Sequence, residues 1–190
     1  MTTTQEDVVV LLIDQHNRIK SLFQQLRTAQ GAQKQELFQD LVRLLAAHET
    51  AEELVVHPAA RRQLNHGKEV VDARLHEEGE AKRELAALYD MGVEHPDFDA
   101  RLADFASAVI EHAGHEEADE FPGLRHSLSA PELQRMAEAV LFAERMAPTR
   151  PHPNAGESMA ANLIAGPPMA LFDRMRDGMR DWRESQDRKS

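Results

Sequence analysis

The stretch HETAEELVVHP, residues 48–58, joins a helical apolar pattern to side chains that ionise. Read as a helix, it places His48 and Glu52 four residues apart on one face, in line with Leu41 and Leu45 before them and Val55 after them. A carboxylate buried without a partner is strongly destabilising, so an inward-facing His–Glu pair requires a cation, a hydrogen-bond network or solvent. The stretch therefore predicts a helix with a polar site on its buried face.

Composition excludes several classes of function. The 190 residues suffice for one domain with a substantial core, and the net charge of -11 argues against a protein that binds nucleic-acid backbones. The chain has no cysteine, which excludes disulfides, thiolate metal sites and a cysteine nucleophile. Metal chemistry would therefore depend on His, Asp and Glu.

The N-terminus, MTTTQEDVVVLLIDQH, shows neither a basic leader nor a small-residue cleavage site. Its apolar run, residues 8–13, is too short to span a membrane. We therefore expect a soluble, cytoplasmic protein with no membrane partner and no nucleic-acid partner.

Periodicity and helix breakers divide the chain into long helical segments. Glycine and proline positions delimit segments at about 4–29, 33–65, 68–91 and 98–121; Pro58 is expected to bend the second, and Pro122-Gly123 to end the fourth. Strict two-residue alternation is rare, so strands are not expected. The predicted fold is all-α, an up-down-up-down four-helix bundle with additional C-terminal helices.

Three regions follow from this division. Residues 1–128 are predicted to form the bundle, and residues 129–147 an additional helix that Ser129 caps. Residues 148–190 are predicted to combine a Pro-rich segment with an amphipathic helix at about 168–184. The apolar stripe of that last helix predicts packing on the protein's own surface, on a second copy in a homodimer or on another protein partner.

Each of the last three helices of the predicted bundle carries a histidine followed by a glutamate four residues later. This spacing aims an imidazole and a carboxylate at one point. The first helix adds His16, so four helices together offer seven nitrogen and oxygen ligands: His16, His48, Glu52, His76, Glu80, His112 and Glu116. Seven such ligands exceed the needs of one tetrahedral zinc and suit two iron or manganese ions bridged by carboxylates.

The support for these pairs is unequal, because a lone HxxxE on a charged helix is commonly a solvated pair. Apolar residues share the faces of the pairs at 48 and 112. His76 and Glu80 instead share their face with Ala73, Gly79, Arg83 and Ala87. Small residues there would leave room for metal or substrate, or simply allow close helix packing.

The order of one histidine and three HxxxE pairs over four helices resembles the hemerythrin-like, or HHE cation-binding, family. The segments DQHNRIKSLF, HETAEELVVHP, LHEEGEAKREL and HAGHEEADEFPGL carry the resemblance over about residues 6–126. It implies a bundle that holds a non-haem diiron centre with an oxo or hydroxo bridge. It also implies the seven ligands named above.

Two departures separate this chain from oxygen-carrying hemerythrins. Glu80 replaces the second histidine of the third helix, and the fourth helix has HxxxE with Glu117 at the spacing of the usual aspartate. Extra carboxylate makes such a site harder and favours ferric iron and redox turnover. The alternative is that Glu80 faces solvent and leaves an open position.

Three nearby residues rank below these ligands. His115, four residues before Asp119, is a candidate for supporting the ligands from outside, while Glu49 and His57 are weaker candidates. In a straight helix His57 would point about 180° away from His48, at 3.6 residues per turn; Pro58 could change that direction.

Two classes of function fit the resemblance. One is a catalase-like enzyme that decomposes hydrogen peroxide and also handles oxygen or nitric oxide. The other is a carrier or sensor that binds oxygen, nitric oxide or iron without turnover. The expected cofactor is a pair of iron ions, with manganese as the alternative, and the expected ligand is a peroxide or a diatomic molecule.

Overall fold

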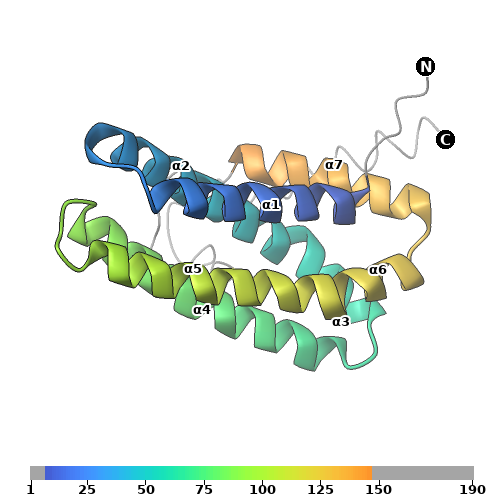
Figure 1. The fold of residues 1–190 in the computed structure, drawn as a ribbon. Coiled ribbons are helices and arrows are strands. Elements are labelled where there is room, and N and C mark those ends of the chain that lie inside the picture. Colours follow the sequence, from blue (N-terminus) through green and yellow to red (C-terminus); the bar gives the residue numbers. More distant parts are fainter. Residues whose placement is uncertain (1–6, 147–190) are drawn as a thin grey trace, which may run out of the picture. The chain divides into compact units, whose positions relative to one another are not determined.

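Four long antiparallel helices form the bundle that the sequence predicts. The computed structural model describes residues 7–146, all of which are in loops or helices with no strand among them. The four helices lie side by side (Figure 1) and are α1 (Val8–Leu26), α2 (Gly31–Ala51), α4 (Gly67–Met91) and α5 (Phe98–His115). The predicted all-α fold is therefore confirmed.

Helices α2 and α5 both continue past a proline through a widened turn. A π-helical turn, η1 (Glu52–Val56), joins α2 to α3 (His57–Gln63), and a second, η2 (Glu116–Glu120), joins α5 to α6 (Phe121–Ser127). In each turn the amide of the residue before the proline donates to a carbonyl five residues earlier: His57 to Glu52, and Phe121 to Glu116. The fourth segment therefore does not end at Pro122, because the π turn accommodates the missing amide.

The ends of the helices follow ordinary capping chemistry. Asp7 caps α1 by accepting a hydrogen bond of 2.9 Å from the amide of Val10. Helix α4 ends at Gly92, whose φ of 79° is readily accessible to glycine. At the start of α4, Gly67 lies so close to α3 that an added Cβ would fall 2.5 Å from the carbonyl oxygen of Ala60.

The additional helix predicted for residues 129–147 is present as α7 (Ala130–Met146). Ser129 precedes it, and Glu132 accepts hydrogen bonds from the amide and the hydroxyl of Ser129 at 2.8 and 2.5 Å. The helix packs against α1, α2 and η1 (Figure 1) through residues buried at helical spacing, which are Leu133, Ala137, Val140 and Ala143. Residues 148–190, with the predicted Pro-rich segment and last helix, lie outside the described residues.

Two apolar clusters hold the bundle on either side of a polar centre. One cluster contains Phe23, Leu41, Leu45 and Phe105 and extends to the end of the bundle where α4 connects to α5. The other joins α1, η1, α6 and α7 and includes Val8, Leu12, Val56, Phe121 and Val140. His16 and His48 belong to neither cluster although both are buried, so polar side chains occupy the space between two dry layers.

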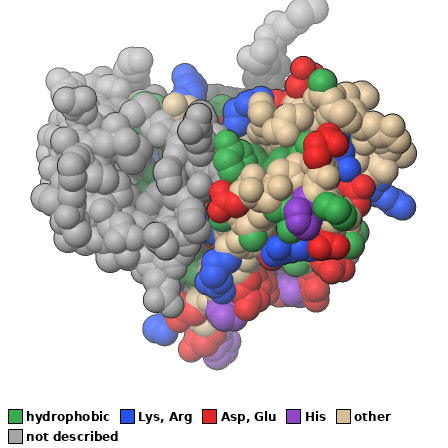
Figure 2. Space-filling model, turned by 90° about the vertical axis from the view of Figure 1, so that its left-hand side faces the viewer, with side chains coloured by type: hydrophobic (Ala, Val, Ile, Leu, Met, Phe, Trp, Pro, Cys, Tyr) green, Lys and Arg blue, Asp and Glu red, His purple; other side chains and the backbone are tan. Residues whose placement is uncertain are grey.

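The surface of the described part is strongly charged. On the face drawn in Figure 2, acidic side chains and histidines gather toward the lower edge, with scattered lysines and arginines. Among residues 7–146, no helix is both long enough and apolar enough to cross a membrane.

Candidate metal centre

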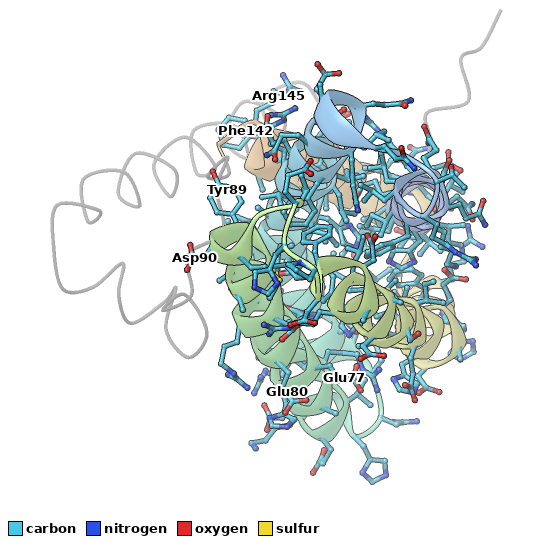
Figure 3. All side chains as sticks on the ribbon, turned by 60° about the vertical axis from the view of Figure 1, so that its left-hand side comes forward. Glu77, Glu80, Tyr89, Asp90, Phe142 and Arg145 are labelled. Carbon is cyan, nitrogen blue, oxygen red and sulfur yellow. The ribbon has the colours of Figure 1, made fainter. Side chains whose placement is uncertain are left out.

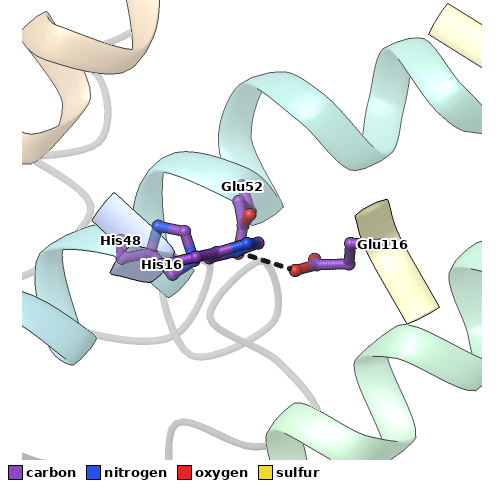
Figure 4. Close-up of side chains that lie close together, drawn as sticks. All are labelled: His16, His48, Glu52 and Glu116. Carbon is purple, nitrogen blue, oxygen red and sulfur yellow. Dashed lines mark ion pairs between the residues drawn. The ribbon is translucent and has the colours of Figure 1, made fainter. Parts of the chain in front are cut away.

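Buried histidines and glutamates from every long helix converge between the two apolar clusters. His16, His48, Glu52 and Glu116 place one donor atom each within 4.8 Å of one another (Figure 4). A second group with the same property consists of Glu52, Glu78, His112 and Glu116. Glu52 and Glu116 belong to both groups, as expected of carboxylates that bridge two neighbouring ions.

The three histidines share one arrangement of their ring nitrogens. Each Nδ1 donates to an oxygen farther from the centre, with donor–acceptor distances of 2.8 Å from His16 to Glu117, 2.7 Å from His48 to Gln15 and 2.8 Å from His112 to Glu77. A neutral imidazole that donates from Nδ1 keeps a lone pair on Nε2. The three Nε2 atoms lie 3.3 to 3.4 Å from Glu116 or Glu52. This is the usual arrangement of metal-binding histidines.

Several ligand atoms at the centre have no hydrogen-bond partner among residues 7–146. They are both carboxylate oxygens of Glu52, both of Glu116, and Nε2 of His16 and of His112. Buried polar atoms are almost always paired, because leaving one unpaired is destabilising by about 1–3 kcal/mol. So many unpaired acceptors in one place fit cations, each of which would bind several of them at once. The donor set therefore fits a metal centre.

Burial and mutual charge shift the acid–base properties of these groups. Burial, together with nearby His16, lowers the pKa of His48 to about 3, so this imidazole is neutral at pH 7. Burial and the charge of Glu116 raise the pKa of Glu52 well above its usual range. Burial would also lower the pKa of His112, but interaction with Glu116 outweighs it and raises that pKa to about 9. The metal-free centre thus holds protons that bound cations would displace.

A second buried polar group adjoins the centre. His57 lies between two carboxylates, 2.5 Å from Glu78 through Nε2 and 3.1 Å from Glu120 through Nδ1. Lys82 lies 3.5 Å from Glu78 and also pairs with Glu53. Burial would lower the pKa of His57, but the hydrogen bonds that His57 donates to Glu120 and Glu78 raise it to about 10. His57 is therefore a buried cation beside the centre in the metal-free protein.

The structure brings five of the seven predicted ligands together: His16, His48, Glu52, His112 and Glu116. It does not bring His76 and Glu80 to them. These two side chains are 75% and 65% exposed and lie 3.7 Å apart as a surface pair. The face assigned to that helix is thus corrected, because the centre receives Glu78, about 200° around the helix from either residue at 3.6 residues per turn.

A signal for Glu78 was present in the sequence. Val71, Glu78 and Leu85 recur every seven residues, and all three are buried in α4. This spacing keeps residues on one face of a helix. The HxxxE pattern of His76 and Glu80 lies instead on the exposed face of α4.

The residues ranked as weaker candidates have distinct places. His115 is 42% exposed and donates to Glu77 at 3.1 Å, so it supports the residue that orients His112. Glu49 is buried 3.6 Å from Lys82, and burial raises its pKa to about 8. His57 is buried rather than turned away from the centre. The π turn η1, in which the amide of His57 donates to the carbonyl of Glu52, brings His57 to the same side of the helix as Glu52. Gln15, Glu77, Glu78 and Glu120 were not predicted.

A cavity of about 520 Å³ reaches the centre. His16, His48, His112 and Glu78 line it on the inside, and its exposed lining residues all belong to α4 and α5. Glu77 and Glu80, labelled on α4 in Figure 3, also line it. A molecule of a few atoms would therefore have a path from solvent to the histidines.

Comparison with known proteins gives a consistent result. The profile described as the hemerythrin HHE cation binding domain matches residues 7–124. An uncharacterized hemerythrin-like protein of Schizosaccharomyces pombe is 28% identical over 169 residues, which cover 88% of this chain and 83% of that protein. A DNA nickase of Nostoc sp. is 32% identical over 125 residues, or 64% of this chain, and the match spans only 34% of the nickase.

One solved structure has the same fold. It is the crystal structure of a hemerythrin HHE cation binding domain-containing protein from Mycobacterium kansasii. The superposition has a TM-score of 0.66 at 20% sequence identity and covers 74% of this chain and 86% of that one. At this identity the likeness concerns the fold alone.

Proposed function

Because the chain belongs to the hemerythrin HHE cation-binding family, we propose that its buried centre binds two iron ions and that the loaded protein decomposes hydrogen peroxide. One observation carries the first part: two groups of four donors share Glu52 and Glu116. Two separate mononuclear sites would not need common ligands. Shared carboxylates at the meeting point of four helices are typical of paired-ion sites in bundles.

The residues divide between the two positions in a definite way. His16 and His48 would bind one ion, His112 and Glu78 the other, and Glu52 and Glu116 both. The bound ions would supply Lewis acidity and a change of oxidation state. The chain contributes the orientation of each imidazole through Gln15, Glu77 and Glu117, and the exclusion of bulk water by the apolar layers on either side.

The composition of the donor set supports redox turnover. Three carboxylates, from Glu52, Glu78 and Glu116, accompany three imidazoles. Carboxylates are harder ligands than imidazoles, and their negative charge stabilises the higher charge of ferric iron. A centre that is stable in the oxidised state suits reaction with peroxide better than reversible oxygen carriage.

A carrier or sensor function is the second candidate. The cavity at the histidines would admit a diatomic molecule as readily as peroxide, and the histidines line it directly. Such a protein would bind oxygen or nitric oxide without consuming it. The two candidates therefore differ in turnover and not in the ligands of the centre.

A DNA-directed activity is not part of this proposal. The match to the DNA nickase leaves about two thirds of that protein unaligned. The present chain has a net charge of -11, which opposes binding to a phosphate backbone.

Metal analysis with a spectroscopic peroxide assay tests the proposal. The purified protein should contain about two irons per chain and evolve oxygen when hydrogen peroxide is added. Two irons with a stable new absorption band under oxygen, and no turnover, would identify the carrier or sensor. Two manganese ions per chain would show that the metal is manganese and not iron. No bound metal after growth in iron and manganese would refute the proposed centre.

A further inference from the structure

We infer that metal ions and uncharged small molecules reach the centre through the cavity along α4 and α5, and that the acidic mouth of this cavity repels anions. The inference rests on the proposed function, since it concerns access to the same centre. It adds a selection by charge, in which anions such as superoxide or nitrite are disfavoured relative to the neutral molecules proposed above.

The inner end of the cavity presents ligand atoms that form no hydrogen bond within the described part of the chain. The side chain of His16 is 1% exposed, lines the cavity and has an Nε2 atom without a hydrogen bond. Nε2 of His112 is unpaired in the same way. A molecule that passes along the cavity therefore arrives at the atoms expected to bind metal.

Part of the cavity wall is apolar. This part includes Ile19, Leu45, Phe105 and Val109, with small side chains at Ala81, Ala108 and Ala113. Such walls offer a passing molecule no fixed counter-charge, and they bring the low dielectric that strengthens charge effects from the mouth.

The mouth carries an excess of negative charge. Five carboxylates line the cavity near its exposed side: Glu77, Glu80, Glu84, Asp104 and Glu111. Two of them are compensated, because Arg101 pairs with Glu84 at 2.8 Å and Arg74 with Glu77 at 3.0 Å. Glu80 has only exposed His76 as a partner, and within residues 7–146 Asp104 and Glu111 form no ion pair.

The described residues that line the cavity include one lysine and no arginine. Lys20 lines the cavity, but its amine lies 3.2 Å from Glu117. Glu80, Asp104 and Glu111 pair with no lysine or arginine within residues 7–146, and they therefore set the sign of the local field. Clefts of one sign raise the local concentration of opposite charges and lower that of like charges, most strongly at low ionic strength.

The test uses Co²⁺ as a probe of access. Metal-free wild-type protein is mixed with Co²⁺ at low ionic strength, and uptake is followed by visible absorption. The mouth variant Glu80→Gln/Asp104→Asn/Glu111→Gln should still bind two ions but take them up at least about threefold more slowly. The matched control Glu36→Gln/Glu69→Gln/Asp90→Asn removes three exposed carboxylates that do not line the cavity and should behave like wild type.

Azide tests the anion side of the inference. The association rate of azide with the Co²⁺-loaded protein should rise at least about threefold in the mouth variant, and added salt should reduce the difference. Ala108→Trp, at an exposed position on the wall, should slow both Co²⁺ and azide.

The outcomes distinguish a failure of the access route from a failure of the metal centre. Equal rates in the mouth and control variants, or a blocked cavity that slows nothing, would overturn the access route while two bound ions per chain still support the centre. Wild-type protein that binds no Co²⁺ would refute the proposed centre itself, and the access route with it.

Discussion

Replacing Glu78 tests which face of α4 supplies the ligand, because the structure assigns Glu78 and the HxxxE pattern assigns Glu80. Glu78 is buried and belongs to the second group of donors, whereas Glu80 is 65% exposed. The substitutions Glu78→Ala and Glu80→Ala make the same chemical change two positions apart in one helix. They therefore form a matched pair.

The magnitudes follow from the contacts. Losing a group that merely supports a ligand weakens metal binding 10–100-fold, so losing Glu78 itself should weaken the second ion by about 100-fold or more, about 2.7 kcal/mol. Breaking a buried ion pair typically destabilises by about 3–5 kcal/mol. Glu120 and Glu53 still partner His57 and Lys82, so we expect Glu78→Ala to destabilise the metal-free protein by only about 2 kcal/mol. Glu80→Ala should change stability by less than about 0.5 kcal/mol.

Metal content after equilibrium dialysis is the primary assay, with Co²⁺ titration for affinity and urea unfolding for stability. Glu78→Ala should retain about one ion per chain, and Glu80→Ala about two. The reverse result, with Glu80→Ala losing an ion and Glu78→Ala keeping both, would show that the face assigned to α4 is wrong and that the sequence pattern was right.

Further predictions concern the bridge, the support of the ligands, pH and packing. Glu52→Ala removes a donor shared by both groups, so bound metal should fall below one ion per chain by elemental analysis; two retained ions would contradict the shared role. Glu77→Leu should weaken Co²⁺ binding about tenfold or more in a titration, because His112 loses the acceptor of its Nδ1. The pKa of His57 is raised to about 10 in the metal-free fold, so protonated His57 stabilises the fold fully below about pH 6.5, and this stabilisation is lost as the pH rises through 10. The difference in free energy of unfolding in urea between wild type and His57→Gln should therefore shrink over that range. Gly67→Ala should destabilise the protein by about 1–3 kcal/mol in urea unfolding, because the added Cβ would lie 2.5 Å from the backbone of α3. Gly114→Ala, where an added Cβ meets no atom within 4 Å, should stabilise it by about 0.5–1 kcal/mol in the same assay.

The fold followed from the sequence because long amphipathic segments and clear breakers are local signals. Gly92 ends α4 where expected, and the helix after Ser129 begins where its capping residues predict. The continuation past Pro122 was missed for a physical reason. Proline ordinarily ends a helix, and the π turn that accommodates it depends on hydrogen bonds that residue periodicity does not reveal.

The site was only partly predictable, because a spacing of four residues does not say which face of a helix is buried. At His48 and His112 apolar neighbours fixed the inward face, and the structure brings both residues to the centre. On α4 the pattern of His76 and Glu80 competed with the seven-residue repeat through Glu78, and the repeat describes the buried face. Partners such as Gln15 were beyond prediction, since a glutamine that orients a histidine on another helix has no local signature.

Because of the unpaired carboxylates at the centre, the free energy of unfolding of the chain should depend on the concentration of available metal. Glu52 is buried beside the charges of Glu116 and Glu78, so an ionised Glu52 opposes the metal-free fold. Ions that bind only the folded chain stabilise it in proportion to the logarithm of their free concentration once they exceed the dissociation constant. The fraction of folded protein, and hence its lifetime against proteolysis, would then rise and fall with the available metal.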